Sequence, residues 1–151
     1  MVINITADQN SLDKLVNLGQ YLLNIDYQRP LINVFDIIAA NTQQNFDNEG
    51  GDGIGWEDLA PRTIREREAL GYNGEHPILT RSGGLRDSFV VDVKPMSGTY
   101  GTPFPYAAEL QYGRENMAAR PMLVITDDLL VQVSALFNAH LKMTLTEYFN
   151  G

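Results

Sequence analysis

The side chains that could act in catalysis are few in this sequence. His76 precedes Ser82 and Ser88, and Asp87 is a carboxylate that could orient such a histidine. A serine hydrolase presents its nucleophile on a Gly-x-Ser-x-Gly turn beside an oxyanion hole, and neither serine lies in that setting. We therefore predict no catalytic residues and a protein that is not an enzyme.

The residues that could bind a metal or a phosphate also lack the spacing that such sites require. The chain has no cysteine, and its two histidines, His76 and His140, are far apart in the sequence, which does not make a zinc site. No Gly-Lys-Ser/Thr follows Gly83 and Gly84, so this glycine pair is not a phosphate-binding loop. We predict that the chain uses no cofactor and no metal.

The stretch 47–55 is acidic and rich in glycine. Asp47, Glu49 and Asp52 are possible oxygen ligands for calcium, but they lack the alternating positions and the closing glutamate of a calcium loop. We expect a flexible loop instead, and one that orders only against a neighbouring subunit.

The charges are unevenly distributed along the 151 residues. The formal net charge is −8, yet seven of the eight arginines fall between Arg62 and Arg120. Residues 1–60 hold two basic and nine acidic side chains, so the N-terminal third is the acidic part. Two interpretations of the arginines stay open: ordinary surface ion pairs with nearby glutamates, or a local basic surface that binds a partner. The acidic chain should be repelled by DNA at long range, because non-specific binding depends on Lys and Arg.

Hydrophobic periodicity predicts the elements that position these residues, beginning with the N-terminal part. Val2, Ile3 and Ile5 suggest a short strand, and Thr6, Asp8 and Ser11 offer oxygens that could cap the next helix. A helix at about 9–24 should bury one apolar face, and a second helix follows at about 31–47. The break at Arg29 and Pro30 between them indicates an antiparallel helical hairpin.

The rest of the chain mixes short helices with strands. A helix should begin at Pro61 and end at Gly71, because proline is favoured in a first turn and glycine just past a helix end. Strands are expected at 89–94, 99–102 and 122–125, and a short helix at 106–112 should end at Gly113. The last helix, about 127–149, should be capped by Thr126 or Asp127 and lie across the sheet.

The predicted fold class is α+β: a small, mostly antiparallel sheet packed against a long C-terminal helix and an N-terminal helical hairpin. We expect a single domain over 1–151, divided into a helical hairpin (1–47), an Arg-rich connecting region (48–89) and strands plus the C-terminal helix (90–151). Trp56, Leu59, Leu85 and Phe89 should hold the connecting region against the core, with Gly83 and Gly84 setting its loop geometry. No apolar run approaches the roughly 20 residues of a membrane span, so we expect a soluble protein.

Four segments in one order suggest a family. They are Trp-x-x-Leu-x-x-x-Thr from Trp56, Ile-Leu-Thr-x-Ser-Gly-x-Leu-Arg-Asp-Ser from Ile78, Tyr-Ala-x-x-x-Gln-x-Gly from Tyr106, and Ala-Arg-Pro-x-Leu from Ala119. Together they resemble the virion morphogenesis, or tail-completion, family of tailed bacteriophages and prophages. The resemblance covers roughly residues 55–125.

The resemblance implies a structural protein that acts in tail completion or head-tail joining. Such a protein would be made in the host bacterial cytoplasm, lie at the neck or tail end of the virion, and form a homo-oligomeric ring, expected to be a hexamer. Its partners would be the tail tube and head-connector proteins, with DNA only as passing cargo and no membrane. The candidate interface residues are Arg62, Arg65, Arg81, Arg86, Tyr106, Tyr112 and Arg120. The alternative is a generic protein-protein interaction module, such as an acidic inhibitor or immunity-type protein.

Overall fold

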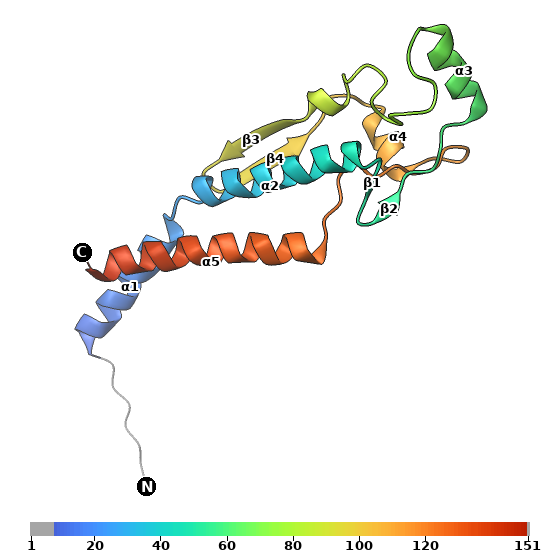
Figure 1. Cartoon of the computed structure of the whole chain (residues 1–151). Helices are drawn as coiled ribbons and strands as arrows, with labels where there is room; N and C mark the ends of the chain where they lie inside the picture. Colours follow the sequence, from blue (N-terminus) through green and yellow to red (C-terminus); the bar gives the residue numbers. More distant parts are fainter. Residues whose placement is uncertain (1–7, 151) are drawn as a thin grey trace.

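Helix α2 (Gln28–Asp47) is the centre of the fold, which the computed structural model describes for residues 8–150. One side of α2 carries the antiparallel hairpin of β3 (Val90–Lys94) and β4 (Ser97–Gly101), and another side packs against α5 (Asp127–Asn150) (Figure 1). The α+β class is confirmed. We expected α5 to lie across the sheet, but α2 lies between the two. The predicted strand at 2–5 and the cap at Thr6 lie outside the described residues.

Helices α1 (Gln9–Leu23) and α2 form the N-terminal helical part as a bent pair, in which α1 extends beyond the N-terminal end of α2 (Figure 1) and, in contrast to our prediction, does not lie antiparallel alongside it. Asp8 caps α1, as predicted. Its carboxylate accepts hydrogen bonds from the Ser11 amide at 2.9 Å and the Ser11 hydroxyl at 2.7 Å, and these bonds lower the pKa of Asp8. The N–H groups of a first helical turn have no partner within the helix, so such a cap supports the start of α1.

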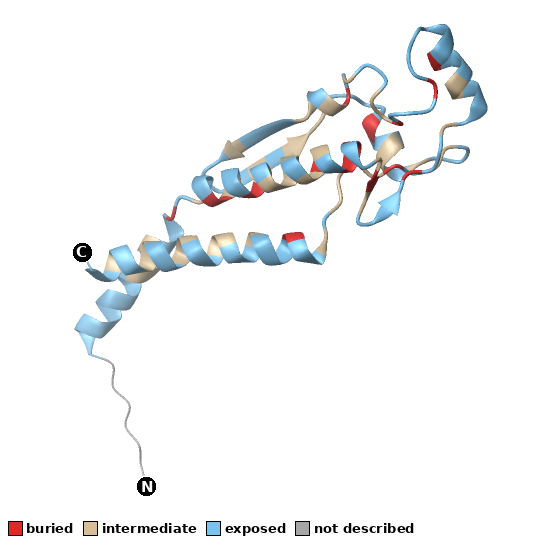
Figure 2. Cartoon of the chain, viewed as in Figure 1, coloured by how far each residue is buried: buried red, intermediate tan, exposed pale blue. Residues whose placement is uncertain are grey.

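The packing of α1 against the rest of the molecule involves its C-terminal turns. Tyr21 packs on Tyr148 near the end of α5, with ring centroids 4.7 Å apart, and its hydroxyl donates to the Thr144 carbonyl at 3.3 Å. No residue of α1 is buried (Figure 2), so the prediction of a buried apolar face on the helix at 9–24 is wrong. The physical reason is its position: α1 lies past the end of α2, where the last turns of α5 supply its packing surface.

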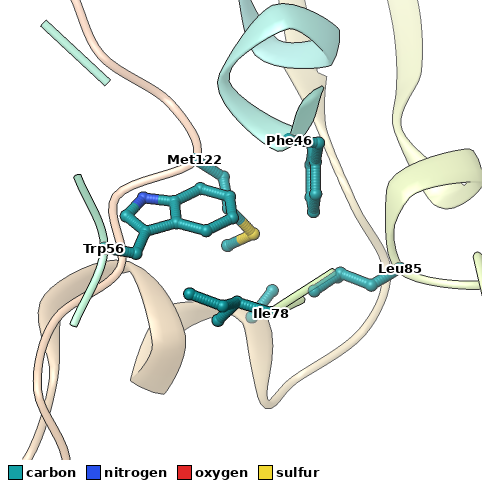
Figure 3. Packing of buried hydrophobic residues seen from close by; sticks show 6 residues of the cluster. Phe46, Trp56, Ile78, Leu85 and Met122 are labelled. Carbon is teal, nitrogen blue, oxygen red and sulfur yellow. The ribbon is translucent and has the colours of Figure 1, made fainter. Parts of the chain in front are cut away.

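The core lies at the other end of α2, where distant segments of the chain meet. Its buried side chains are Phe46, Trp56, Ile78, Leu85, Ala107 and Met122 (Figure 3), and Leu59, Leu79, Phe89 and Leu110 pack around them. Phe46 meets Trp56 edge-on with ring centroids 5.7 Å apart, and the indole N–H donates to the Pro121 carbonyl at 3.0 Å. The core therefore holds α2, the connecting region and the segment before α5 together.

The short helices begin and end where the sequence predicts. Helix α3 (Pro61–Ala69) starts at Pro61, and α4 (Ala107–Tyr112) is followed by Gly113. Gly71 and Gly113 have φ of 79° and 71°, a left-handed conformation that glycine adopts without a steric penalty and that stops a helix. Thr126 caps α5, because its hydroxyl accepts the Leu129 amide at 3.2 Å.

The acidic stretch after α2 is ordered within the single chain, which corrects the prediction of a flexible loop. β1 (Gly50–Gly51) pairs with β2 (Ile54–Gly55), and Asp52 and Gly53 between them have φ of 54° and 74°. Two successive residues with positive φ make the tight turn that matches the twist of a hairpin, and Asp-Gly is a favoured pair for it. The Trp56 amide donates to the Glu49 carbonyl at 2.6 Å and closes the hairpin.

The third strand expected at 122–125 is absent from the described residues. The side-chain amide of Gln111 makes the hydrogen bonds that a neighbouring strand would otherwise make. Gln111 accepts the Met122 amide at 2.9 Å and the Leu123 amide at 3.1 Å, and donates to the Leu123 carbonyl at 2.8 Å. Asn45 of α2 donates to the Met122 carbonyl at 2.9 Å. These bonds satisfy the buried backbone without a partner strand.

Candidate interaction surface

A wide hollow of about 1100 Å³ opens at the α3 end of the molecule, between α3, the loop 78–85 and the segment 106–120. Its volume is slightly above the usual range of small-molecule sites, about 300–1,000 Å³. The charged and aromatic residues that line it are Glu57, Asp58, Arg62, Arg67, Arg81, Tyr106, Arg114, Glu115 and Arg120.

Arg67 is buried beneath this hollow, with 3% of its surface exposed. Its guanidinium donates to four backbone carbonyls: Gly74 and Glu75 at 3.3 Å, Pro77 at 2.8 Å and Ile78 at 3.1 Å. Burial lowers the pKa of Arg67, with a smaller lowering by the charge of Arg81. The side chain ties α3 to the loop that follows it.

Arg120 has a similar structural environment. Its side chain is buried and donates to the Glu57 carbonyl at 2.9 Å and the Asp58 carbonyl at 2.8 Å. The Arg120 amide donates to the Leu110 carbonyl at 2.7 Å, which joins α4 to the same point. The predicted interface role of Arg120 stays a prediction, and its guanidinium already positions the floor of the hollow.

Three arginines at the rim of the hollow, Arg62, Arg81 and Arg114, are more exposed. Each contacts another side chain on the surface. The pairs are Arg62 with Glu66 (2.8 Å), Arg114 with Glu109 (3.0 Å), and Arg81 above the ring of Tyr72 (5.6 Å to the centroid). The hydrogen bond to Glu66 raises the pKa of Arg62. Exposed ion pairs contribute little stability, at most about 1 kcal/mol, so the fold does not depend on these contacts.

The structure thus brings four of the predicted interface residues, Arg62, Arg81, Tyr106 and Arg120, to one hollow. The other three lie elsewhere. Arg86 forms an ion pair with Asp47 at 2.7 Å and a hydrogen bond with Gln43 at 2.7 Å, so it ties its turn to α2. Arg65 and Tyr112 are exposed outside the hollow, Tyr112 with 81% of its surface.

Comparison with known families decides what kind of protein carries this surface. The profile of the phage virion morphogenesis family matches residues 3–142. The chain belongs to the phage virion morphogenesis family. No curated protein and no solved structure matches the chain. The family is one of structure and assembly, so the protein has a structural or assembly role in making the phage virion.

The groups that suggested catalysis have other partners in this virion morphogenesis protein. His76 contacts the carboxylate of Glu49, which also accepts the Ile78 amide. Ser88 donates to the Leu85 carbonyl at 2.7 Å and shares a hydrogen bond with Thr102 at 2.6 Å. Within residues 8–150, no three His, Asp or Glu side chains are placed to hold a metal ion.

Sequence reasoning missed the polar side chains that organise the surface from inside. Arg67 lies in a helix of mixed charge, a pattern typical of a solvated surface, so the sequence carries no signal for its burial. Gln111 and Asn45 bind a distant backbone segment, and neither amide is recognisable without that segment. Among the described helices of this virion morphogenesis protein, none combines the length and apolar content needed to cross a bilayer.

Proposed function

We propose that this protein completes the phage tail or joins the tail to the head, and that it works as a ring of identical subunits. The observation that carries this proposal is the family match over residues 3–142. The expected partners are further copies of the chain, with six as the expected number, together with the tail tube and the head connector. Its place would be the neck or tail end of the virion.

A closed ring needs two unlike, complementary patches on every subunit, because neighbours meet head to tail. The elongated molecule has two unlike ends (Figure 1), the α3 end with its arginine-rimmed hollow and the α1 end. We assign Arg62, Arg81 and Tyr106, and the exposed Arg65 and Tyr112, to contacts with a neighbouring subunit or a neck partner. Arg86 and Arg120 support that surface from within the chain.

The acidic N-terminal third has a complementary use in this proposal. Nine acidic and two basic side chains in residues 1–60 give this part a strongly negative charge. A channel lined by such a surface repels the phosphate backbone and lets DNA pass without binding. Opposite charges on the arginine rim and on a partner would steer the two together.

The proposal is tested by deleting the gene from its phage and examining the lysate by electron microscopy. We expect DNA-filled heads and separate tails, and joined virions again when the wild-type protein is supplied in trans. Joined virions at normal yield without the gene would contradict the proposed function.

A charge reversal in the rim tests the surface itself. Arg81→Glu should lower the yield of joined virions on the order of tenfold, because like charges across an interface are costly. Arg29→Glu is the matched control, since Arg29 is also exposed but lies at the start of α2, away from the hollow. Equal yields from the two variants would remove the rim from the proposal.

A further inference from the structure

The exposed face of α1 is its more apolar face. Leu12, Leu15, Val16, Leu22 and Leu23 are 42%, 65%, 58%, 38% and 81% exposed. Their spacing of three, four and seven places them along one stripe of the helix. The face that meets α5 includes Tyr21, whose hydroxyl and ring make the contacts described above. A helix of 15 residues is marginal on its own in water, so this stripe indicates a partner.

Helix α5 also leaves an apolar row uncovered. Leu129 and the partly buried residues of α5 lie on the side near α2 and α1, while Val131, Ala135, Ala139 and Met143 follow one another at spacing four on the exposed side. Val131 is 68% exposed and Met143 is 65% exposed. Polar Gln132 and Lys142 are exposed beside this row, so the row is a narrow apolar strip that suits one further helix.

The two surfaces fit each other in length and shape. At 1.5 Å per residue, the α1 stripe from residue 12 to residue 23 is about 16 Å long, and the α5 row from 131 to 143 is about 18 Å long. Ala135 and Ala139 in the middle of the α5 row are smaller than Val131 and Met143 at its ends, whereas the α1 stripe consists of leucines and one valine. Ridges of one helix that enter grooves of another are the usual geometry of helix packing.

Two exposed charges and the helix dipoles fit an antiparallel arrangement. Lys142 is exposed at the end of the α5 row, and Asp13 is exposed beside the start of the α1 stripe. Neither forms an ion pair within residues 8–150. With the helices antiparallel, Asp13 of one copy lies near Lys142 of another copy. The two antiparallel helix dipoles also interact favourably.

We propose that α1 of one subunit packs antiparallel on the exposed row of α5 in a second copy of this chain. The chain's own α1 is held at the end of α5 by Tyr21, on the side away from this row, so the contact is between molecules. Because the two patches differ, the contact is head to tail and can close a ring. The inference rests on the proposed ring, and it leaves the arginine rim free for a neck partner.

Three exposed valines allow a matched experiment on the full chain. Val16→Glu disables the α1 patch, Val131→Glu disables the α5 patch, and Val90→Glu is the control on β3, where Val90 is 64% exposed. Glutamate has at least the helix propensity of valine, so the two helix variants should keep their fold, and Val90 is exposed on its strand. Circular dichroism and the emission of buried Trp56 check that fold. The mass in solution is then measured by light scattering behind a sizing column across a wide concentration range.

We expect a closed oligomer from the wild type and from Val90→Glu, and monomers from Val16→Glu and Val131→Glu. An equimolar mixture of the two monomeric variants should give a 1:1 heterodimer and stop there, because each contributes one intact patch. A variant that keeps the wild-type mass, or a mixture that stays monomeric, overturns the proposed contact and leaves the ring standing.

A wild type that stays monomeric at every concentration overturns self-docking, and the apolar stripe then belongs to a different partner. The deletion and complementation of the gene test the proposed function separately, since joined virions are counted whatever the mass of the purified protein. Failure of this inference and failure of the proposed function are therefore distinguishable.

Discussion

Arg67 shows how this chain buries a full positive charge without a carboxylate at hydrogen-bond distance. Four carbonyls surround the guanidinium, and each such bond to a charged donor is worth about 1.5–3 kcal/mol in general. The five N–H donors of arginine form a planar fork that no other side chain reproduces. The loop 74–78 therefore depends on one residue of α3 for its conformation.

Replacing Arg67 with Leu should lower the free energy of unfolding by about 3 kcal/mol, because the carbonyls lose their donor in a buried place. For a chain of this size that change corresponds to a melting temperature lower by roughly 6–12 °C. Differential scanning calorimetry of a monomeric form measures it.

Arg65→Leu is the control for this measurement, since Arg65 is exposed on the same helix and its loss should change stability by less than about 0.5 kcal/mol. Equal melting temperatures for the two variants would show that the carbonyls around Arg67 find water instead.

Single residues also explain where local pattern fails. The apolar, partly β-branched run at 122–125 has the composition of a strand, yet a strand needs a neighbouring backbone. Here the side-chain amide of Gln111 takes the place of that backbone, and no residue within 122–125 predicts this contact. The Asp52-Gly53 pair is the opposite case: the pair is a local signal for a tight hairpin turn, yet we expected a flexible loop, and the structure contains the hairpin.

At the scale of elements, periodicity and end signals predicted the helices well. Pro61, Gly71 and Gly113 marked boundaries that the structure confirms, because proline and glycine restrict the backbone whatever surrounds them. The partner of an apolar face was not predictable in the same way. The spacing of Leu12, Val16 and Leu23 gives a face, but whether the same chain or another covers it depends on tertiary geometry.

The contact between β4 and α2 gives a prediction at this scale. A Cβ added at Gly98 would collide with the ring of Phe35 on α2 and lie 3.2 Å from the Asp92 carbonyl. Gly98→Ala should therefore lower the free energy of unfolding by about 1–3 kcal/mol, the usual range for overpacking, measured by urea denaturation.

Gly101 in the same strand provides the comparison, because a Cβ there would meet nothing within 4 Å. Gly101→Ala should be neutral or slightly stabilising, since it reduces the entropy of the unfolded chain. Similar losses in both variants would mean that the approach of β4 to α2 is not the cause.

At the scale of the whole molecule, the sequence predicted the α+β class and the acidic N-terminal third. It did not predict that α2 lies between the sheet and α5, because the three are joined by long-range contacts that no local pattern encodes. The result is an elongated subunit with its core at one end and largely exposed helices at the other (Figure 2). The proposed contact between subunits would tie stability to assembly.

The melting temperature of the wild type should therefore depend on protein concentration. Association through native helices stabilises the folded state by mass action, about 1.4 kcal/mol for each tenfold increase in concentration. This corresponds to a rise of roughly 3–6 °C per tenfold for a chain of this length. Val16→Glu should melt at one temperature throughout the range, and a wild type that does the same would indicate no self-association.

The position of Trp56 has a further, spectroscopic consequence. It is the one tryptophan of the chain, and its indole lies in the core beside Met122 and Phe46 (Figure 3). Its emission therefore reports on that core, while the amide circular dichroism comes largely from α1, α2 and α5. Recorded together during denaturation, the two signals separate melting of the helical end from loss of the core, with no label introduced into the protein.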